Sequence, residues 1–278
     1  MIGIIDVSRN ITGVYGAGVL DYAADRHISF DYAIGSSAGA ANLTAFLAGK
    51  AAMSYLFYYD YASRRDYMNL GNLMQDASLI DVDLLYEEAF NVFPDNPFDL
   101  DSAHDAIRGF YILAAHAETG RAHYFDIAGG HPVLPALKAS RNIPIVNEPY
   151  IVDDIPFYDG YISDPLPYEK AFADGCDKVI LILARPVSYR RDKNRDRILS
   201  QLMKKRFPLA ASRLSSLSVL YNRQVEDALQ LQKNGKLLIL APDSFSPVQI
   251  LLKDRHRITD LYHRGYQDAA KIEEFLKD

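Results

Sequence analysis

One serine, Ser37, lies in a sequence motif that often carries a nucleophilic hydroxyl. Gly35-Ser36-Ser37-Ala38-Gly39 has the spacing G-x-S-x-G, with Ser37 at its centre. Between a strand and a helix, this motif forms a strained turn that lifts the serine hydroxyl out of the sheet. Glycines on both sides of the serine let neighbouring backbone approach closely. Ser37 is therefore the candidate nucleophile, and Gly35 and Gly39 are the glycines of its elbow. The alternative is an ordinary turn of small residues.

A serine hydroxyl needs a neighbouring base to take its proton. Asp159 is the best candidate, because it follows the alternating segment 155–158 and marks the end of a predicted strand. Asp-Gly pairs are also common in plain turns. The alternative bases are His256 and His263, as in an α/β-hydrolase triad. Those enzymes place several strands before the nucleophile, whereas this chain has about one strand and one helix before the strand that leads to Ser37.

The elements that must position these residues alternate between strands and helices. This alternation predicts one domain over residues 1–278, with three α/β/α layers and a mainly parallel central sheet. The predicted strands and hairpins are Ile2–Ile5, Phe30–Ile34, 109–125, 149–157, Val179–Ala184 and Leu237–Ala241. The predicted helical segments are Gly13–Arg26, Ala40–Ala48, 51–93 (with Ile80–Phe93 as one helix), Pro132–Ser140, Pro165–Asp174, 189–206, Leu214–Lys233 and Ile258–Leu276.

Composition narrows the class of protein. The net charge of −6 gives no support for nucleic-acid binding. The one cysteine, Cys176, fits a reducing compartment and is expected to be a buried thiol. No apolar run approaches the roughly 20 residues of a membrane span, and the first residues lack the basic start of a signal peptide. We therefore expect a cytoplasmic protein.

The histidines are scattered along the chain. No H-x-x-x-H or C-x-x-C spacing is present. Metal sites built on one helix or one loop usually show such spacings. We therefore expect neither a metal nor another cofactor.

Residues 189–207 combine basic and apolar side chains. The default interpretation is a solvated helix face. The alternative is a patch that lies on an anionic membrane and makes the protein peripheral to it. The side chains of that patch would be Leu199, Leu202, Met203 and Phe207, with the basic run Lys204–Arg206 beside them.

These motifs together resemble the patatin-like phospholipases, specifically their bacterial branch. The likeness rests on Gly35–Gly39, Asp159-Gly160 and Ser163–Pro167, and extends to Asp6-Val7, Gly13–Tyr22, Glu118–Gly120, Tyr124–Asp126, Val179–Pro186 and Tyr221–Val225. It covers nearly the whole chain. The resemblance implies a patatin-like α/β/α fold and a Ser–Asp dyad without histidine, acting on the ester bonds of lipids.

The resemblance also implies roles for residues near the dyad. Ser37 would form an acyl-enzyme and Asp159 would be the general base. The oxyanion would be held by the N–H of Ala38 and by the loop after the first strand, where Arg9 and Asn10 lie. The substrate would be a lipid or another ester.

That loop departs from the family pattern, which has three glycines, an apolar residue, an arginine and a glycine. This chain has Ser8-Arg9-Asn10-Ile11-Thr12-Gly13, and Tyr161 replaces the second glycine after Asp159. Side chains restrict φ and occupy volume where the backbone must approach a substrate, although asparagine tolerates a left-handed conformation. Losing one oxyanion donor costs about 10²–10³ in kcat.

Three interpretations of the function follow. We expect a serine acyl hydrolase of the lipase or phospholipase A type, because the elbow and Asp159 are retained. The second is a catalytically impaired patatin-like protein that binds lipid. The third is transfer of the acyl group to an acceptor other than water, which uses the same acyl-enzyme.

Overall fold

The fold is built on one central β-sheet. The computed structural model describes residues 1–61, 107–145, 147–183, 185–243 and 255–277. Within these residues the strand order is β5-β6-β3-β2-β1-β7-β8, and β4 also pairs with β3. The parallel strands are β1 (Ile2–Asp6), β2 (Tyr32–Ser36), β3 (Gly109–His116), β7 (Lys178–Ile182) and β8 (Leu237–Leu240). The antiparallel strands are β4 (Ala122–Asp126), β5 (Tyr150–Val152) and β6 (Ile155–Asp159). The predicted mainly parallel sheet is confirmed.

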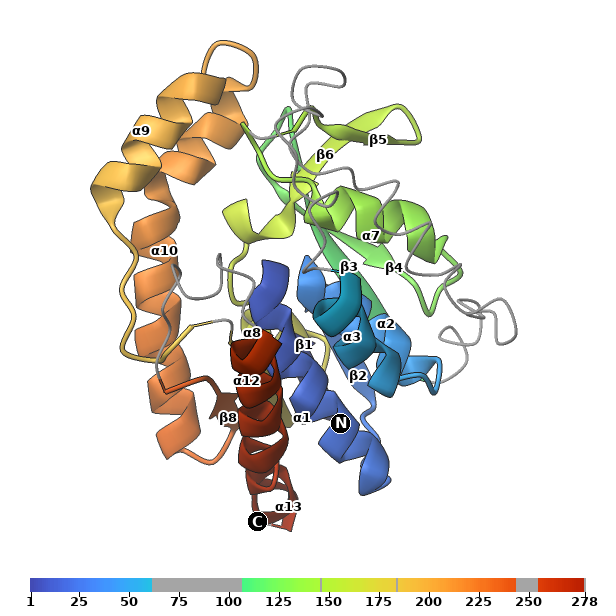
Figure 1. Ribbon diagram of the computed structural model, residues 1–278. Coiled ribbons are helices and arrows are strands. Elements are labelled where there is room, and N and C mark those ends of the chain that lie inside the picture. The colour runs from blue at the N-terminus through green and yellow to red at the C-terminus, as the bar shows by residue number, and fades with distance from the viewer. Residues whose placement is uncertain (62–106, 146, 184, 244–254, 278) are drawn as a thin grey trace.

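Helices cover both faces of the sheet (Figure 1). Successive strand residues point to opposite faces, so Ile4 packs into one apolar cluster and Ile5 into the other. The first cluster joins the sheet to α1 (Gly13–Asp25), α2 (Ala38–Leu47), α7 (Val133–Arg141) and α13 (Lys271–Lys277). The second joins it to α8 (Tyr168–Ala173), α9 (Lys193–Met203) and α10 (Pro208–Lys233). The predicted α/β/α layering is confirmed.

Two helix predictions need correction. The segment Ile258–Leu276 forms two helices, α12 (Arg255–Asp268) and α13, because the backbone bond from Ala270 to Gln267 tightens the chain at the break. The charged segment 189–206 is helical only from Lys193, where the Asp192 side chain caps α9 by accepting from the Asn194 N–H. The predicted helix Ile80–Phe93 lies outside the described residues. The prediction of one domain over 1–278 stays a prediction.

Several helices pack beside α1, and one of them, α12, contacts it through the backbone. A turn, η1 (Asn10–Thr12), precedes α1, and α3 (Ala52–Leu56), the π-helix η2 (Phe57–Tyr61) and α12 pack beside it. A Cβ on Gly18 of α1 would lie 2.1 Å from the Tyr262 carbonyl oxygen of α12, and one on Gly265 would lie 2.0 Å from the Tyr15 carbonyl oxygen. The two helices therefore touch through their backbones. Because α1 begins directly after the 8–12 loop, this contact fixes one end of that loop.

Tyrosine hydroxyls also join α1 to α12. Tyr262 donates to Asp21 at 2.6 Å, and Tyr15 donates to Asp268 at 2.9 Å. Asp21 is buried, and burial raises the pKa of its carboxyl to about 6. An ionised Asp21 therefore destabilises the folded protein at neutral pH.

We expect Asp21→Asn to raise the thermal midpoint at pH 7.5 and to have little effect near pH 4. The folded pKa lies above the ordinary value of about 3.9, so the wild type loses stability as the pH rises from about 4 to about 6. The asparagine oxygen still accepts from Tyr262. Circular dichroism melts across this pH range measure the difference. Asp25→Asn is the control, since Asp25 accepts from Tyr266 at an exposed position. A difference that does not change with pH would contradict the assignment.

Candidate active site

The turn at Ser37 has the strain that the motif predicts. Ser37 connects β2 to α2 with φ 55° and ψ −122°. A residue with a Cβ rarely adopts a positive φ, and such strain costs about 1–3 kcal/mol. Strain of this kind persists only where surrounding contacts enforce it, and it clusters at functional sites.

Both glycines of the motif are required by close backbone contacts. A Cβ on Gly35 would lie 2.4 Å from Ala40 Cα in α2, and one on Gly39 would lie 2.1 Å from the Asp6 carbonyl oxygen in β1. No side chain fits either position without moving backbone. The predicted elbow glycines therefore do bring α2 against the ends of β1 and β2.

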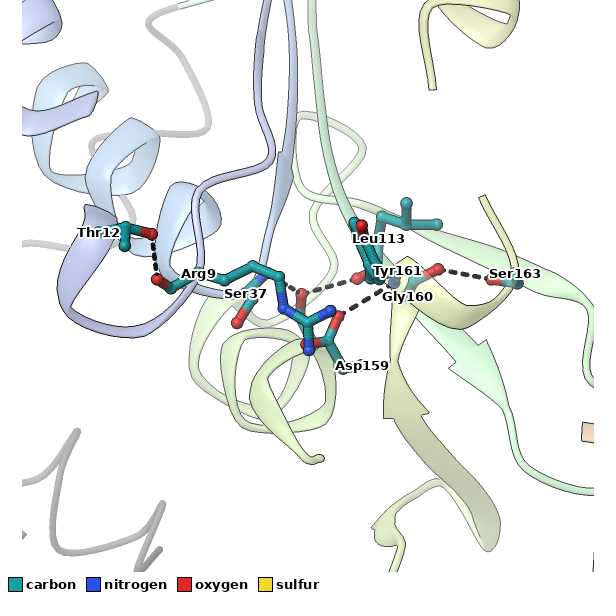
Figure 2. A network of polar contacts seen from close by, with 9 residues as sticks. Arg9, Thr12, Ser37, Leu113, Asp159, Gly160, Tyr161 and Ser163 are labelled. Carbon is teal, nitrogen blue, oxygen red and sulfur yellow. Dashed lines mark hydrogen bonds and ion pairs between the residues drawn. The ribbon is translucent and has the colours of Figure 1, made fainter. Parts of the chain in front are cut away.

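Asp159 ends β6 on the same edge of the sheet as Ser37. In the strand register Ser36 lies opposite Leu113, and Ala114 lies opposite Asp159. Strands are about 4.8 Å apart, so the backbones of Ser37 and Asp159 are separated by about 10 Å, on either side of β3. Figure 2 shows both side chains in this one region. Both residues are buried, with 1% of Ser37 and 0% of Asp159 exposed.

The end of α7 holds both residues in place. The Ser37 N–H donates to Ser140 Oγ at 2.8 Å, and Ser140 Oγ donates to the Leu113 carbonyl at 2.7 Å. Two residues on, the Asn142 carbonyl accepts from the Asp159 N–H at 2.8 Å. Sequence reasoning missed Ser140 and Asn142, because a serine and an asparagine at a helix end carry no distinctive pattern.

The Asp159 carboxylate has two described donors. Arg9 Nη2 donates to Oδ2 at 2.8 Å, and the Tyr161 N–H donates to Oδ1 at 3.0 Å (Figure 2). Among the described residues, no hydrogen bond joins the Ser37 hydroxyl to Asp159. A carboxylate has about four acceptor sites, so Asp159 keeps acceptor capacity for a serine hydroxyl.

The loop after β1 contains two of the predicted oxyanion donors, Arg9 and Asn10, and the third, Ala38, begins α2. Asn10 has φ 50°, the left-handed region that asparagine tolerates. The Arg9 carbonyl accepts from both the N–H and the hydroxyl of Thr12, which fixes the backbone of the loop. In the described part of the chain no hydrogen bond uses the backbone N–H of Ala38, Arg9 or Asn10. Their roles as donors stay predictions.

The Asp6 side chain holds the start of the loop after β1. Its carboxyl is buried and accepts from the Ser8 N–H at 2.8 Å and from Asn42 Nδ2 at 3.0 Å. Burial raises the pKa of Asp6, and the hydrogen bonds from Ser8 and Asn42 oppose that rise. The Gly39 N–H donates to the Ser8 carbonyl at 3.2 Å, so the loop and the elbow are tied together. Asp6 was noted in the sequence only as part of the resemblance, and its role in holding this loop was not predicted.

The alternative bases His256 and His263 lie on a helix and not at the sheet edge that carries Ser37. His256 and His263 both lie on α12, which packs against α1, and neither is hydrogen-bonded to Ser37 within the described ranges. No group of three or more His, Cys, Asp or Glu side chains in the described residues is arranged to hold a metal ion. Cys176 is buried and unpaired, as predicted.

Comparison with known families identifies two stretches of the chain. A family model described as patatin-like phospholipase matches residues 10–172, which is more than half of the chain. A second model, described as a domain of unknown function (DUF6363), matches residues 207–278.

Two individual proteins are also similar to the chain. The uncharacterized protein YjjU of Escherichia coli (strain K12) is 28% identical over 179 residues, which are 63% of this chain and 49% of YjjU. The chain therefore spans about half the length of this relative. The crystal structure of VipD from Legionella pneumophila aligns with a TM-score of 0.46 and 11% identity, over 97% of this chain and 66% of VipD.

We expect Ser37→Gly to be more stable than Ser37→Ala by about 1 kcal/mol. Both variants lack the hydroxyl, but only glycine adopts the positive φ of Ser37 without strain, which outweighs its larger entropy in the unfolded chain. Urea unfolding measures the difference. Ser36→Gly and Ser36→Ala are the matched control pair, because Ser36 lies within β2. There glycine should be the less stable by about 0.5–1 kcal/mol. The same order at both positions would show that Ser37 is unstrained.

Proposed function

Because the chain belongs to the patatin-like phospholipase family, we propose that it is a serine acyl hydrolase that cleaves ester bonds of lipids. Ser37 is the nucleophile and Asp159 the general base. The observation that carries the proposal is the strained backbone of Ser37, held on the same sheet edge as a buried carboxylate. A fold that enforces such strain at one hydroxyl indicates a use for that hydroxyl.

The proposed reaction has two stages. In the first, Ser37 Oγ bonds to the ester carbonyl carbon, its proton passes to Asp159, and the carbonyl oxygen becomes an oxyanion near the N-terminus of α2. The C–O bond to the alcohol then breaks, and the alcohol leaves with the proton from Asp159. In the second stage water bonds to the acyl carbon and gives a proton to Asp159, the bond from that carbon to Ser37 Oγ breaks, the carboxylic acid leaves, and the proton returns from Asp159 to Ser37 Oγ. Catalytic hydrogen bonds are often long without substrate, so the missing Ser37–Asp159 bond is compatible with this scheme.

A second candidate function is lipid binding without turnover. It is favoured by the Arg9–Asp159 ion pair, which neutralises the proposed base, and by the side chains at positions 8–10 where the resembled pattern has glycines. Transfer of the acyl group to an acceptor other than water is a third candidate, and it uses the same acyl-enzyme.

The proposed membrane surface differs from the sequence prediction. Met203 and Phe207 are buried and Leu199 is partly buried, and all three pack into the core shared with α10. Of the predicted apolar residues, Leu202 is exposed. The exposed apolar residues are Ile198 and Leu202 on α9 and Leu209 on α10, which are 67%, 65% and 56% exposed. The exposed basic residues beside them are Lys204, Lys205 and Arg206. We call these six residues the α9–α10 surface.

The α9–α10 surface is connected to the proposed site. Phe207, which directly follows Arg206, packs edge to face against the ring of Tyr158, with 5.7 Å between the ring centroids. Tyr158 directly precedes Asp159. Arg206 forms an ion pair with Glu148, just before β5. Exposed apolar residues beside basic ones suit an anionic lipid surface, and we propose that this surface brings the site to its substrate. Among the described helices none is long and apolar enough to span a bilayer.

We expect wild-type protein to hydrolyse short-chain p-nitrophenyl esters and Ser37→Ala and Asp159→Asn to lose this activity. Removing a dyad member should cost at least about 10³ in kcat. Release of p-nitrophenol measures the rate, and labelling of Ser37 by a fluorophosphonate reports whether the hydroxyl is activated. Ser36→Ala, one residue away, is the control and should keep both signals. Equal rates for wild type and Ser37→Ala would favour the lipid-binding alternative.

We expect binding to vesicles to increase with their phosphatidylglycerol content and to fall when Ile198 and Leu202 are both changed to Glu. The change removes apolar contact and adds negative charge. Co-sedimentation at low salt measures binding, and higher salt should weaken it by screening. Val219→Glu is the control, since Val219 is 59% exposed on α10 but lies outside the α9–α10 surface. Binding that ignores lipid charge would contradict the proposed surface.

A further inference from the structure

The positions that depart from the resembled glycine pattern contact one another. Thr12 Oγ1 donates to the Arg9 carbonyl at 2.5 Å, and the Thr12 N–H donates to the same oxygen at 3.1 Å. The Arg9 guanidinium lies 4.3 Å from the centre of the Tyr161 ring and bonds to Asp159. Residues from two distant parts of the chain therefore form one connected cluster around the proposed base (Figure 2).

Tyr161 forms a fixed platform for the Arg9 side chain. It is buried, its ring lies 6.0 Å from that of Tyr221, and its N–H holds Asp159. A second guanidinium, from Arg191, lies 5.4 Å from the same ring. The charge of Arg191 is compensated by Asp196, at 2.7 Å. A guanidinium over a tyrosine ring is held by the cation–π attraction, so the Arg9 guanidinium is held by the Tyr161 ring and by Asp159.

Arg9 keeps donors available for a further ligand. Its guanidinium has five N–H donors, and within the described residues only the one to Asp159 is used. A quarter of the Arg9 side chain is exposed, whereas the Asp159 side chain is fully buried. The Arg9 side chain therefore reaches the buried carboxylate from a partly exposed position, and Figure 2 shows Arg9, Ser37 and Asp159 in one region.

The charge balance of the cluster changes during the proposed reaction. At rest the Arg9 cation is paired with the Asp159 anion. When Asp159 takes the Ser37 proton it becomes neutral, and Arg9 loses its partner. In the same step the substrate carbonyl oxygen becomes negative. A preorganised positive charge beside such an anion, which exists only in the tetrahedral intermediate, lowers the barrier.

We propose that the Arg9 guanidinium is a catalytic group that stabilises the oxyanion, so that a charged side chain supplies what a glycine-rich loop supplies through backbone N–H groups. The inference rests on the proposed ester hydrolysis at Ser37. In that step the Ser37 Oγ–C bond forms, the carbonyl π electrons move to oxygen, and the proton goes to Asp159. The oxyanion accepts from Arg9 and from the Ala38 N–H.

The test compares kcat and KM for a soluble p-nitrophenyl ester among wild type, Arg9→Ala, Arg9→Lys and Ser37→Ala. We expect Arg9→Ala to lower kcat by about 10²–10³ with little change in KM, because the interaction exists only in the transition state. Arg9→Lys should fall between the two, since it keeps the charge but not the planar fork. Millimolar guanidinium ion should partly restore the Arg9→Ala rate. Arg223→Ala, which removes an exposed arginine with a 3.9 Å contact to Asp227, is the charge-matched control.

The outcomes separate this inference from the proposed function. A wild-type rate equal to that of Ser37→Ala overturns both. Loss of activity in Ser37→Ala together with an unchanged or raised kcat in Arg9→Ala overturns the role of Arg9 alone. Arg9→Ala leaves Asp159 buried without its cation and is checked for folding by circular dichroism. If it does not fold, Arg9→Lys decides: a lowered kcat at constant KM supports the inference, and wild-type kinetics overturn it.

Discussion

The site depends on one buried carboxylate and the groups that make its burial tolerable. An ionised carboxylate removed from water costs several kcal/mol unless it is paired and hydrogen-bonded. Asp159 is fully buried and has both kinds of partner: Arg9 supplies a positive charge and the Tyr161 N–H supplies a donor. Because Arg9 comes from the loop after β1, the same ion pair draws that loop over the end of β6. The Arg9–Asp159 ion pair therefore both positions the loop and balances the charge of the buried carboxylate.

The sheet fixes how far Ser37 lies from Asp159. Ser37 and Asp159 are far apart in sequence, but β3 lies between their strands and fixes the distance and register. The end of α7 adds a direct clamp, with Ser140 on one residue and the Asn142 carbonyl on the other. The strained backbone of Ser37 is thus held by the close contacts of Gly35 and Gly39 and by the hydrogen bond from its N–H to Ser140 of α7.

Most of the framework could be predicted from the sequence, and the reasons are physical. Apolar runs such as Val179–Ala184 are typical of strands covered on both faces, and G-x-S-x-G between a strand and a helix predicts the strained turn at Ser37. Asp159 could be located because strand alternation stops there. The Arg9–Asp159 pair could not be predicted, since it joins positions 150 residues apart. Of the four apolar residues predicted to lie outward, Leu199, Met203 and Phe207 pack towards α10 and Leu202 is exposed, because charge patterning does not show which face of α9 is covered.

The backbone contact between α1 and α12 joins the two segments of the chain that match different family models. Gly18 lies in the segment that matches the patatin-like model, and Gly265 lies in the segment that matches the model of unknown function. Neither glycine can acquire a side chain without forcing the two helices apart. A helix that packs in the place of α12 must therefore present an equally bare surface to α1. The segment that matches the patatin-like model and the segment that matches the model of unknown function therefore share one closely packed interface.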